Sequence, residues 1–295
     1  MKHTKIIAAL GLATLMSGCV VIASSPSRAD FHIQKELTLD ARSLTALDIE
    51  TGSGSLVVIG ESGLTEIQVT ADIYTDKEYS DNYELTLNES GKSGFLVAKN
   101  KSTSGFWVGS SPRIDVVIRV PEGLSLDIAD GSGNMEISDI NAQVDIKDGS
   151  GGMVVKNIKG DTNINDGSGE IEVSEVNGNL SIIDGSGEIS INEIRGDVTI
   201  DDGSGTIYAK NIFGSADIED GSGDLTVKQI TGIVPVDDGS GSITVNDAGG
   251  LKIQWQDKNI MVISANAPLC KQMLGKGLHD DVLHRRENYY ISALH

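Results

Sequence analysis

Aromatic residues and basic charge are both scarce in this sequence. Only 4% of the 295 residues are aromatic, and 23 Lys and Arg residues stand against 43 Asp and Glu residues, which leaves a formal net charge of −20. With so few aromatic side chains, a large globular core of the usual kind is not expected. The acidic balance repels phosphate backbones, so nucleic acid is not expected as a partner.

Beyond the N-terminus the sequence has no long apolar run. A membrane-spanning helix would need about 20 consecutive apolar residues, so no such helix is expected there. At the N-terminus itself, Lys2 and Lys5 precede an apolar stretch, residues 6–16, which ends in small residues and Cys19. A charged, an apolar and a small-residue segment in this order are typical of a secretory signal.

Residues 15–19, LMSGC, resemble the lipobox of bacterial lipoproteins, in which the Cys becomes the lipid-bearing first residue of the mature chain. The resemblance implies a signal peptide over residues 1–18, a lipid on Cys19, a tether over residues 19–43 and an outer-membrane location. A rival cleavage site at residues 27–29 would instead give a soluble periplasmic or secreted protein.

Cysteine is limited to Cys19 and Cys270. If Cys19 carries a lipid, Cys270 has no partner within the chain. Because free cysteines are usually buried, we expect an inert internal thiol. An exposed thiol able to pair with another chain is the alternative in an oxidising envelope.

A four-residue motif, DGSG, recurs seven times at a spacing of eighteen residues. The copies begin at Asp130, Asp148, Asp166, Asp184, Asp202, Asp220 and Asp238. Counted from each Asp, apolar residues fall at positions 6, 8, 11, 15 and 17 of the repeat, and Gly is common at position 13. A spacing of two is the period of a β-strand, so each repeat predicts two short strands.

The strict register favours identical coils stacked in parallel, because one coil cannot bury its aliphatic residues alone and its neighbours can cover them. The sequence therefore predicts an all-β fold, a parallel β-solenoid with 18-residue rungs over residues 121–255. The usual hand of parallel connections predicts a right-handed coil. Residues 44–120 are expected to form a β-rich N-terminal region, and residues 256–295 an irregular C-terminal cap.

The repeat is imperfect at both ends. Near the N-terminus, residues 46–58 form an eighth, imperfect copy with Thr51 in place of Asp. In the last copy, Leu251, Ile253 and Trp255 come one residue out of step, so their side chains are expected to turn to the opposite face.

Three stretches carry a family resemblance: VPEGLSLDIADGSGNMEI, the recurrent G-S-G-x-I-x-V followed by G-x-V-x-I, and LDIETGSGSLVV. They resemble the bacterial β-strand-repeat family of adhesin-like proteins (DUF4097/DUF2807-like), over roughly Leu44 to Trp255. The resemblance implies a β-repeat fold in the bacterial envelope. It brings no catalytic residues that could be transferred to this chain.

The seven repeated aspartates are the first candidate site. Stacked coils place equivalent residues about 4.8 Å apart, so these residues, from Asp130 to Asp238, should form a file of carboxylates. In water each neighbouring pair repels by on the order of 1 kcal/mol. In a structural interpretation, backbone amides of the following Ser and Gly hold each carboxylate in a turn. In a functional one, Ca²⁺ bridges the file. No other cofactor is expected.

The segment KSTSGFWVGSSPR, residues 101–113, is the second candidate site. Phe106, Trp107 and Val108 form an apolar row among small polar residues. We expect either an exposed contact loop or a plug for the first rung.

Taken together, the residues predict a non-catalytic lipoprotein of the cell envelope, anchored in a membrane by its lipid. Its solenoid surface would bind a protein or glycan of the envelope or of a cell surface. A structural or Ca²⁺-responsive envelope protein is the alternative. A carbohydrate-active enzyme comes third, since the sequence shows no phosphate-binding loop and no nucleophile elbow.

Overall fold

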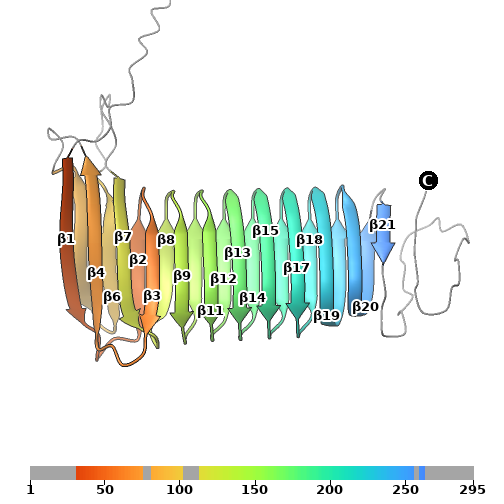
Figure 1. The fold of residues 1–295 in the computed structure, drawn as a ribbon, viewed down its shortest axis with the longest axis horizontal. Helices are drawn as coiled ribbons and strands as arrows, with labels where there is room; N and C mark the ends of the chain where they lie inside the picture. The colour runs from red at the N-terminus through yellow and green to blue at the C-terminus, as the bar shows by residue number, and fades with distance from the viewer. Residues whose placement is uncertain (1–30, 76–80, 102–112, 256–258, 263–295) are drawn as a thin grey trace, which may run out of the picture.

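The computed structural model describes residues 31–75, 81–101, 113–255 and 259–262, which form an elongated rod of stacked β-strands (Figure 1). Every regular element within these ranges is a strand. The same ranges contain no helix of the length and hydropathy that crossing a membrane requires. The predicted signal peptide and most of the predicted cap, residues 256–295, lie outside the described residues.

The 21 strands of the described residues fall into two groups, seven that end by Pro121 and fourteen that begin at Ser125 or later. The first group is β1 (Phe31–Asp40), β2 (Ala46–Thr51), β3 (Leu56–Glu61), β4 (Glu66–Thr75), β5 (Tyr83–Ser90), β6 (Ser93–Asn100) and β7 (Arg113–Pro121). The second group is β8 (Ser125–Asp130), β9 (Met135–Ile140), β10 (Val144–Asp148), β11 (Met153–Ile158), β12 (Thr162–Asp166), β13 (Gly169–Val176), β14 (Leu180–Asp184), β15 (Gly187–Ile194), β16 (Val198–Asp202), β17 (Gly205–Ile212), β18 (Ala216–Asp220), β19 (Gly223–Asp238), β20 (Ser242–Trp255) and β21 (Asn259–Val262).

Each repeat contributes one strand to each of two parallel stacks. The stack that follows the DGSG corners runs β9, β11, β13, β15, β17, β19, β20 and β21. The stack that leads into the corners runs β8, β10, β12, β14, β16, β18 and then the second halves of β19 and β20. Ile171 pairs with Ile189 and Ile189 with Ile207, so the register repeats every eighteen residues. The predicted parallel β-solenoid is confirmed; its hand stays a prediction.

The imperfect copy near the N-terminus is a full rung of the solenoid. Strand β2 lies between β6 and β8, and β3 lies between β7 and β9. Antiparallel strands then cover this end, because β4 pairs with β7 and β1, while β5 pairs with β6. Such pairing closes the edge of the parallel stacks.

Strand β1 falls inside the predicted tether, residues 19–43. Its alternating sequence, FHIQKELTLD, lets it pair with β4 along its whole length. Ile33, Leu37 and Leu39 pack against the core on one side of this strand. The folded part of the chain therefore begins earlier than the sequence pattern indicated.

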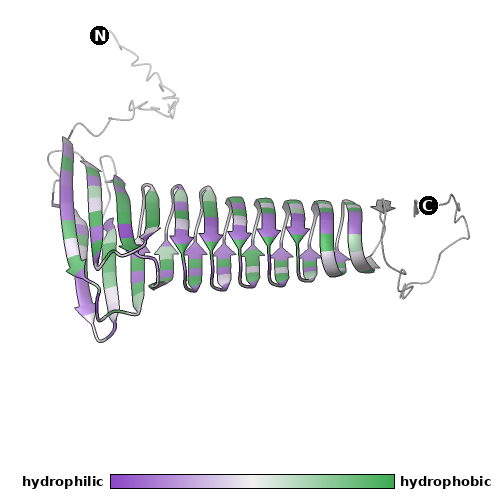
Figure 2. Ribbon diagram, turned by 60° about the horizontal axis from the view of Figure 1, so that its bottom comes forward, coloured by the Kyte–Doolittle hydropathy of each residue, from purple (hydrophilic) through white to green (hydrophobic). Residues whose placement is uncertain are grey.

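Aliphatic ladders fill the interior of the rod. Side chains at positions 6, 8, 11, 15 and 17 of each repeat point inward, and almost all are buried; Ile171, Val173, Val176, Leu180 and Ile182 of one repeat are at most 1% exposed. The intervening positions point outward, which gives the alternating hydrophobic and hydrophilic bands along the strands in Figure 2. Ladders of this kind replace an aromatic core, as the composition required.

The expected reversal is wrong at Leu251. The step from Ile230 to Ile233 in one rung is matched by the shorter step from Ala248 to Gly250 in the next. Beyond this bulge, Val234 pairs with Leu251, which packs against the core. The missing residue is absorbed at the corner, where backbone geometry can change, so the following strand keeps its face.

The second Gly of each DGSG corner stacks directly on its counterpart in the previous rung. Gly187 has φ +153°, and a Cβ atom built on it would lie 1.6 Å from the carbonyl oxygen of Gly169. Any side chain here collides with backbone, which cannot move without breaking the stack.

We predict that Gly187→Ala destabilises the solenoid by on the order of 3 kcal/mol, because it combines an unfavourable φ with a backbone clash. The matched control is Gly123→Ala, where a Cβ would meet nothing within 4 Å. Denaturant unfolding of the two variants measures the difference. Equal unfolding midpoints would show that the corners are not packed as described.

Candidate functional site

The seven repeated aspartates form a continuous file along one inner corner of the rod. Neighbours are in register, as for Asp148 with Asp166 and Asp184 with Asp202. The side chains point inward, and exposure falls to 3% for Asp166 and 2% for Asp202. Buried carboxylates require partners, because an unpaired buried charge is strongly disfavoured.

Backbone amides of the DGSG corner supply one partner. The Ser150 amide donates to Oδ1 of Asp148 at 3.3 Å, and the Ser204 amide donates to Oδ1 of Asp202 at 3.1 Å. Asp184 and Asp220 accept from their own corners in the same way. The structural interpretation of the motif as an Asp-stabilised turn is confirmed at these four positions.

The other carboxyl oxygen has no hydrogen-bond partner in most of the file. This is the case for the Oδ2 atoms of Asp130, Asp148, Asp184 and Asp202, all shielded from solvent. At Asp166 the amides of Gly167 and Ser168 lie close enough to lower the pKa, yet neither oxygen has a partner in hydrogen-bond geometry. A buried acceptor left without a donor costs about 1–3 kcal/mol.

The file raises the pKa of its own members. Burial, and then the charges of Asp130 and Asp166, raise the pKa of Asp148 to about 6. Burial is also the main cause that raises the pKa of Asp184 and of Asp202. Desolvation and neighbouring like charges both favour the neutral acid.

Thr51 closes the file at its N-terminal end. Its hydroxyl Oγ1 donates to Oδ1 of Asp130 across 2.6 Å, from the rung where Thr replaces Asp. A hydroxyl donor at this position ends the row of like charges with a neutral partner. The row of carboxyl groups therefore ends at the imperfect copy, where Thr51 takes the place of Asp.

Metal ligation of the file has no preformed geometry. No group of three or more His, Cys, Asp or Glu side chains suited to a metal ion occurs within the described ranges. The Ca²⁺ hypothesis for the seven aspartates stays a prediction. Cys19 and the Phe106–Val108 row both lie outside the described residues.

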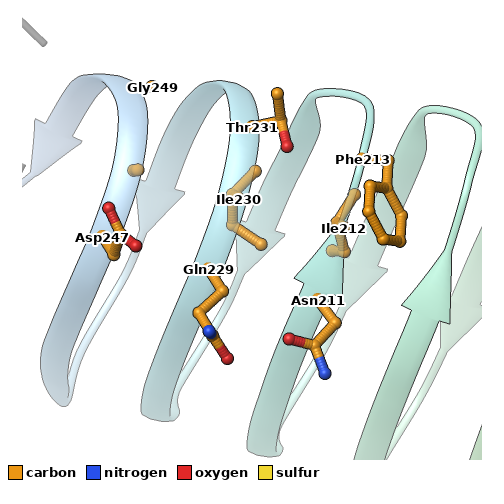
Figure 3. A pocket seen from close by; sticks show the side chains of 9 residues that line it. Asn211, Ile212, Phe213, Gln229, Ile230, Thr231, Asp247 and Gly249 are labelled. Atoms are coloured by element: carbon orange, nitrogen blue, oxygen red, sulfur yellow. The ribbon is translucent and has the colours of Figure 1, made fainter. Parts of the chain in front are cut away.

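A groove runs along a second corner of the rod, formed by positions 10 to 12 of the repeat, over β17, β19 and β20. It has a volume of about 360 Å³ and is lined by the same three positions of three successive rungs: Asn211, Ile212, Phe213, Gln229, Ile230, Thr231, Asp247, Ala248 and Gly249. The middle residue of each set is buried and forms the floor. Figure 3 shows the polar side chains of Asn211, Gln229 and Asp247 in one row beside Phe213 and Thr231.

The polar row of this groove adopts a left-handed backbone conformation. The φ angles are +55° at Asn211, +58° at Gln229 and +63° at Asp247. All seven repeats share this conformation at position 10, which bends the chain between its two stacks. Asn and Asp tolerate such angles better than most residues. Glu175 and Glu193 adopt the same left-handed conformation in their rungs.

Apolar exposure concentrates at the same corner. Phe213 is 61% exposed and Ile233, on the next rung, is 56% exposed, the two highest values among the large apolar side chains of the described residues. Sequence reasoning missed both, although Phe213 interrupts a column that holds Lys159, Asn177 and Arg195 in other rungs. An aromatic residue at a repeat position that is otherwise polar or charged was the signal that could have identified this exposed site.

A second depression, of about 510 Å³, lies over the first rungs. Val57 and Val154 line it together with Glu136, Glu170 and Glu172. It contains no aromatic side chain, and its carboxylates repel one another. The corner groove combines apolar groups with two amide side chains, one hydroxyl and a single carboxylate, which better fits a ligand site.

Several solved structures are similar to this chain at low sequence identity. A candidate lipid-binding protein from Parabacteroides distasonis is 18% identical, with a TM-score of 0.48, over 80% of this chain and 96% of that one. A candidate adhesin from the same organism is 13% identical, with the same score and coverage. A candidate adhesin from Parabacteroides merdae is 16% identical, with a TM-score of 0.45, over 80% and 95% of the two chains.

Comparison with curated proteins gives no match. The family model described as Toastrack DUF4097 matches residues 44–258, from just before β2 to just past the end of β20. This range holds the imperfect copy, all seven DGSG corners and the groove. Because the match spans well over half of the sequence, the chain belongs to the Toastrack DUF4097 family.

Proposed function

We propose that this protein is a non-catalytic binding scaffold of the bacterial envelope, tethered to a membrane by a lipid on Cys19. The solenoid then acts as a rigid spacer that presents the corner groove to a ligand. The observation that carries the proposal is the placement of the groove and of β1 at opposite parts of the rod (Figure 1).

The distance involved follows from the strand order. Ten strand spacings separate β1 from β20 along one stack. At about 4.8 Å for each spacing, they add to roughly 50 Å. A chain tethered before Phe31 would hold β1 nearest the membrane. The groove over β17, β19 and β20 would lie toward the far end, where a partner can reach it.

An uncharged glycan chain is the ligand that the groove favours. The exposed ring of Phe213 offers an apolar face to a sugar ring. Beside it, the amide group of Gln229 offers donors and acceptors for hydroxyl groups. The Asn211 amide, whose Nδ2 already donates to Oδ1 of Asn192, offers a further N–H and its oxygen. The two amides lie on successive rungs, so successive sugars along the rod would meet successive side chains. The net charge of −20 opposes binding of an anionic polymer.

The lipid tether predicts the mature N-terminus. Protein purified from a bacterial membrane fraction should begin at Cys19 and carry the mass of attached acyl chains, and Cys19→Ala should release it from the membrane. Intact-mass and peptide analysis measure both. A mature chain that begins at Asp30 would refute the tether and leave the groove proposal standing.

The groove predicts a sharp effect of one exposed side chain. On an array of uncharged glycans, the wild-type chain should bind at least one extended glycan, and Phe213→Ser should weaken that binding at least about tenfold, the loss of one contact of about 1.4 kcal/mol. Because Phe213 is exposed, the variant should melt at the wild-type temperature.

Ile183→Ser is the matched control for this experiment. Ile183 is 49% exposed on β14, outside the groove, so its removal deletes a comparable apolar surface. It should leave glycan binding unchanged. Equal losses in the two variants, or no binding by the wild-type chain, would contradict the proposed role of the groove.

A further inference from the structure

The aspartate file contains a repeated hydrogen-bond deficit that the corner geometry does not remove. A Ser amide serves one oxygen of Asp148, Asp184 and Asp202, and the Thr51 hydroxyl serves one oxygen of Asp130. The second oxygen of these four residues stays without a donor in a dry environment. The same deficit recurs in successive rungs. A general solution must therefore come from the file itself.

We propose that the aspartate file is a proton-binding ladder, in which neighbouring carboxyl groups share protons through O–H···O hydrogen bonds that tie successive rungs together. A protonated carboxyl group is a donor as well as an acceptor. Rungs repeat about every 4.8 Å, so a carboxyl group in one rung lies within reach of the next after small side-chain rotations. One bound proton supplies a donor to an oxygen that otherwise has none and removes one like-charge repulsion.

Burial and the like charges that face the file favour protonation, whereas the corner amides and the Thr51 hydroxyl favour the charged form. Along the file, Asp130 and Asp166 flank Asp148, and Asp184 flanks Asp166. From the outer side of β16, the charge of Asp201 raises the pKa of Asp202. The hydroxyl of Thr51 is the neutral partner at the N-terminal end. Within the described residues, no Lys, Arg or His contributes to the shifted pKa of Asp130, Asp148, Asp166, Asp184 or Asp202.

The ladder links the stability of the rod to pH. An unfolded Asp has a pKa of about 3.9, whereas burial and like charges raise the pKa of Asp148 in the folded chain to about 6. The folded state thus binds protons more tightly than the unfolded state. The stabilisation is complete below pH of about 4 and is lost as pH rises through the folded value. The solenoid should melt at a higher temperature in mildly acidic solution.

Two measurements test the ladder on the full chain. With ¹³C in the Asp carboxyl groups, the Asp148 resonance should titrate at a pH of about 6. The resonances of Asp166, Asp184 and Asp202 should also titrate above the ordinary Asp pKa of about 3.9, because burial raises the pKa of each. In thermal melts, Asp184→Asn should raise Tm at pH 7.5 by at least about 2 °C. The Asn side chain of this variant carries amide N–H groups at every pH, whereas a carboxyl group is a donor only when it is protonated. The side-chain oxygen of the Asn can still accept a hydrogen bond from the Ser186 amide. Below pH 5 the gain should shrink.

Asp217→Asn is the matched control, since it removes one negative charge from the outer face of β18. It should change Tm less than Asp184→Asn at pH 7.5, and its effect should not shrink below pH 5 in the same way. Two results would overturn the ladder. One is titration of Asp148, Asp166, Asp184 and Asp202 at the ordinary Asp pKa of about 3.9. The other is a rise in Tm on adding Ca²⁺ at pH 7.5 that Asp184→Asn abolishes, because the file would then hold a metal ion.

Discussion

The structure depends on one constraint: the aliphatic residues of a rung can be buried only against the same residues of the rungs above and below. Ile171, Ile189 and Ile207 illustrate it, since each lies in register with the next and all are fully buried. Register is therefore fixed along the whole rod. Every other repeated feature, including the glycine contacts at the corners and the file of carboxyl groups, follows from bringing identical residues together at one strand spacing.

Repetition has an electrostatic consequence that does not arise in proteins without a sequence repeat. A useful turn residue, when repeated in register, becomes a row of like charges inside the molecule. The Asp148 side chain stabilises its corner through the Ser150 amide, yet the same stacking places Asp148 beside Asp130 and Asp166. The array accommodates the row by shifting protonation and ends it with the Thr51 hydroxyl. Local turn chemistry and long-range stacking thus make opposite demands on the same carboxyl group.

The strands, the two stacks and the buried positions could be predicted from the sequence, because the apolar spacing of two is unambiguous. The inward direction of Asp was missed, although positions 15, 17 and 19 of the count follow the same alternation and position 19 is the next Asp. Because Asp is polar, we did not count it among the inward-facing residues of the alternating pattern. The return of Leu251 to the inner face could not be predicted from a fixed repeat length, because a corner absorbed the missing residue. The groove was missed because Phe213 and Gln229 belong to different repeats, and only stacking brings them together.

In-register stacking is tested most directly by the distance between equivalent outward residues. Spin labels placed through Thr199→Cys and Asp217→Cys, in a chain whose native cysteines are replaced by Ser, would stand on paired positions of β16 and β18. They should show strong dipolar broadening at one strand spacing, about 4.8 Å between backbones. Labels at Thr199→Cys and Tyr208→Cys, on strands of different stacks, should not. Weak coupling in the first pair would contradict the solenoid register and with it the aspartate file.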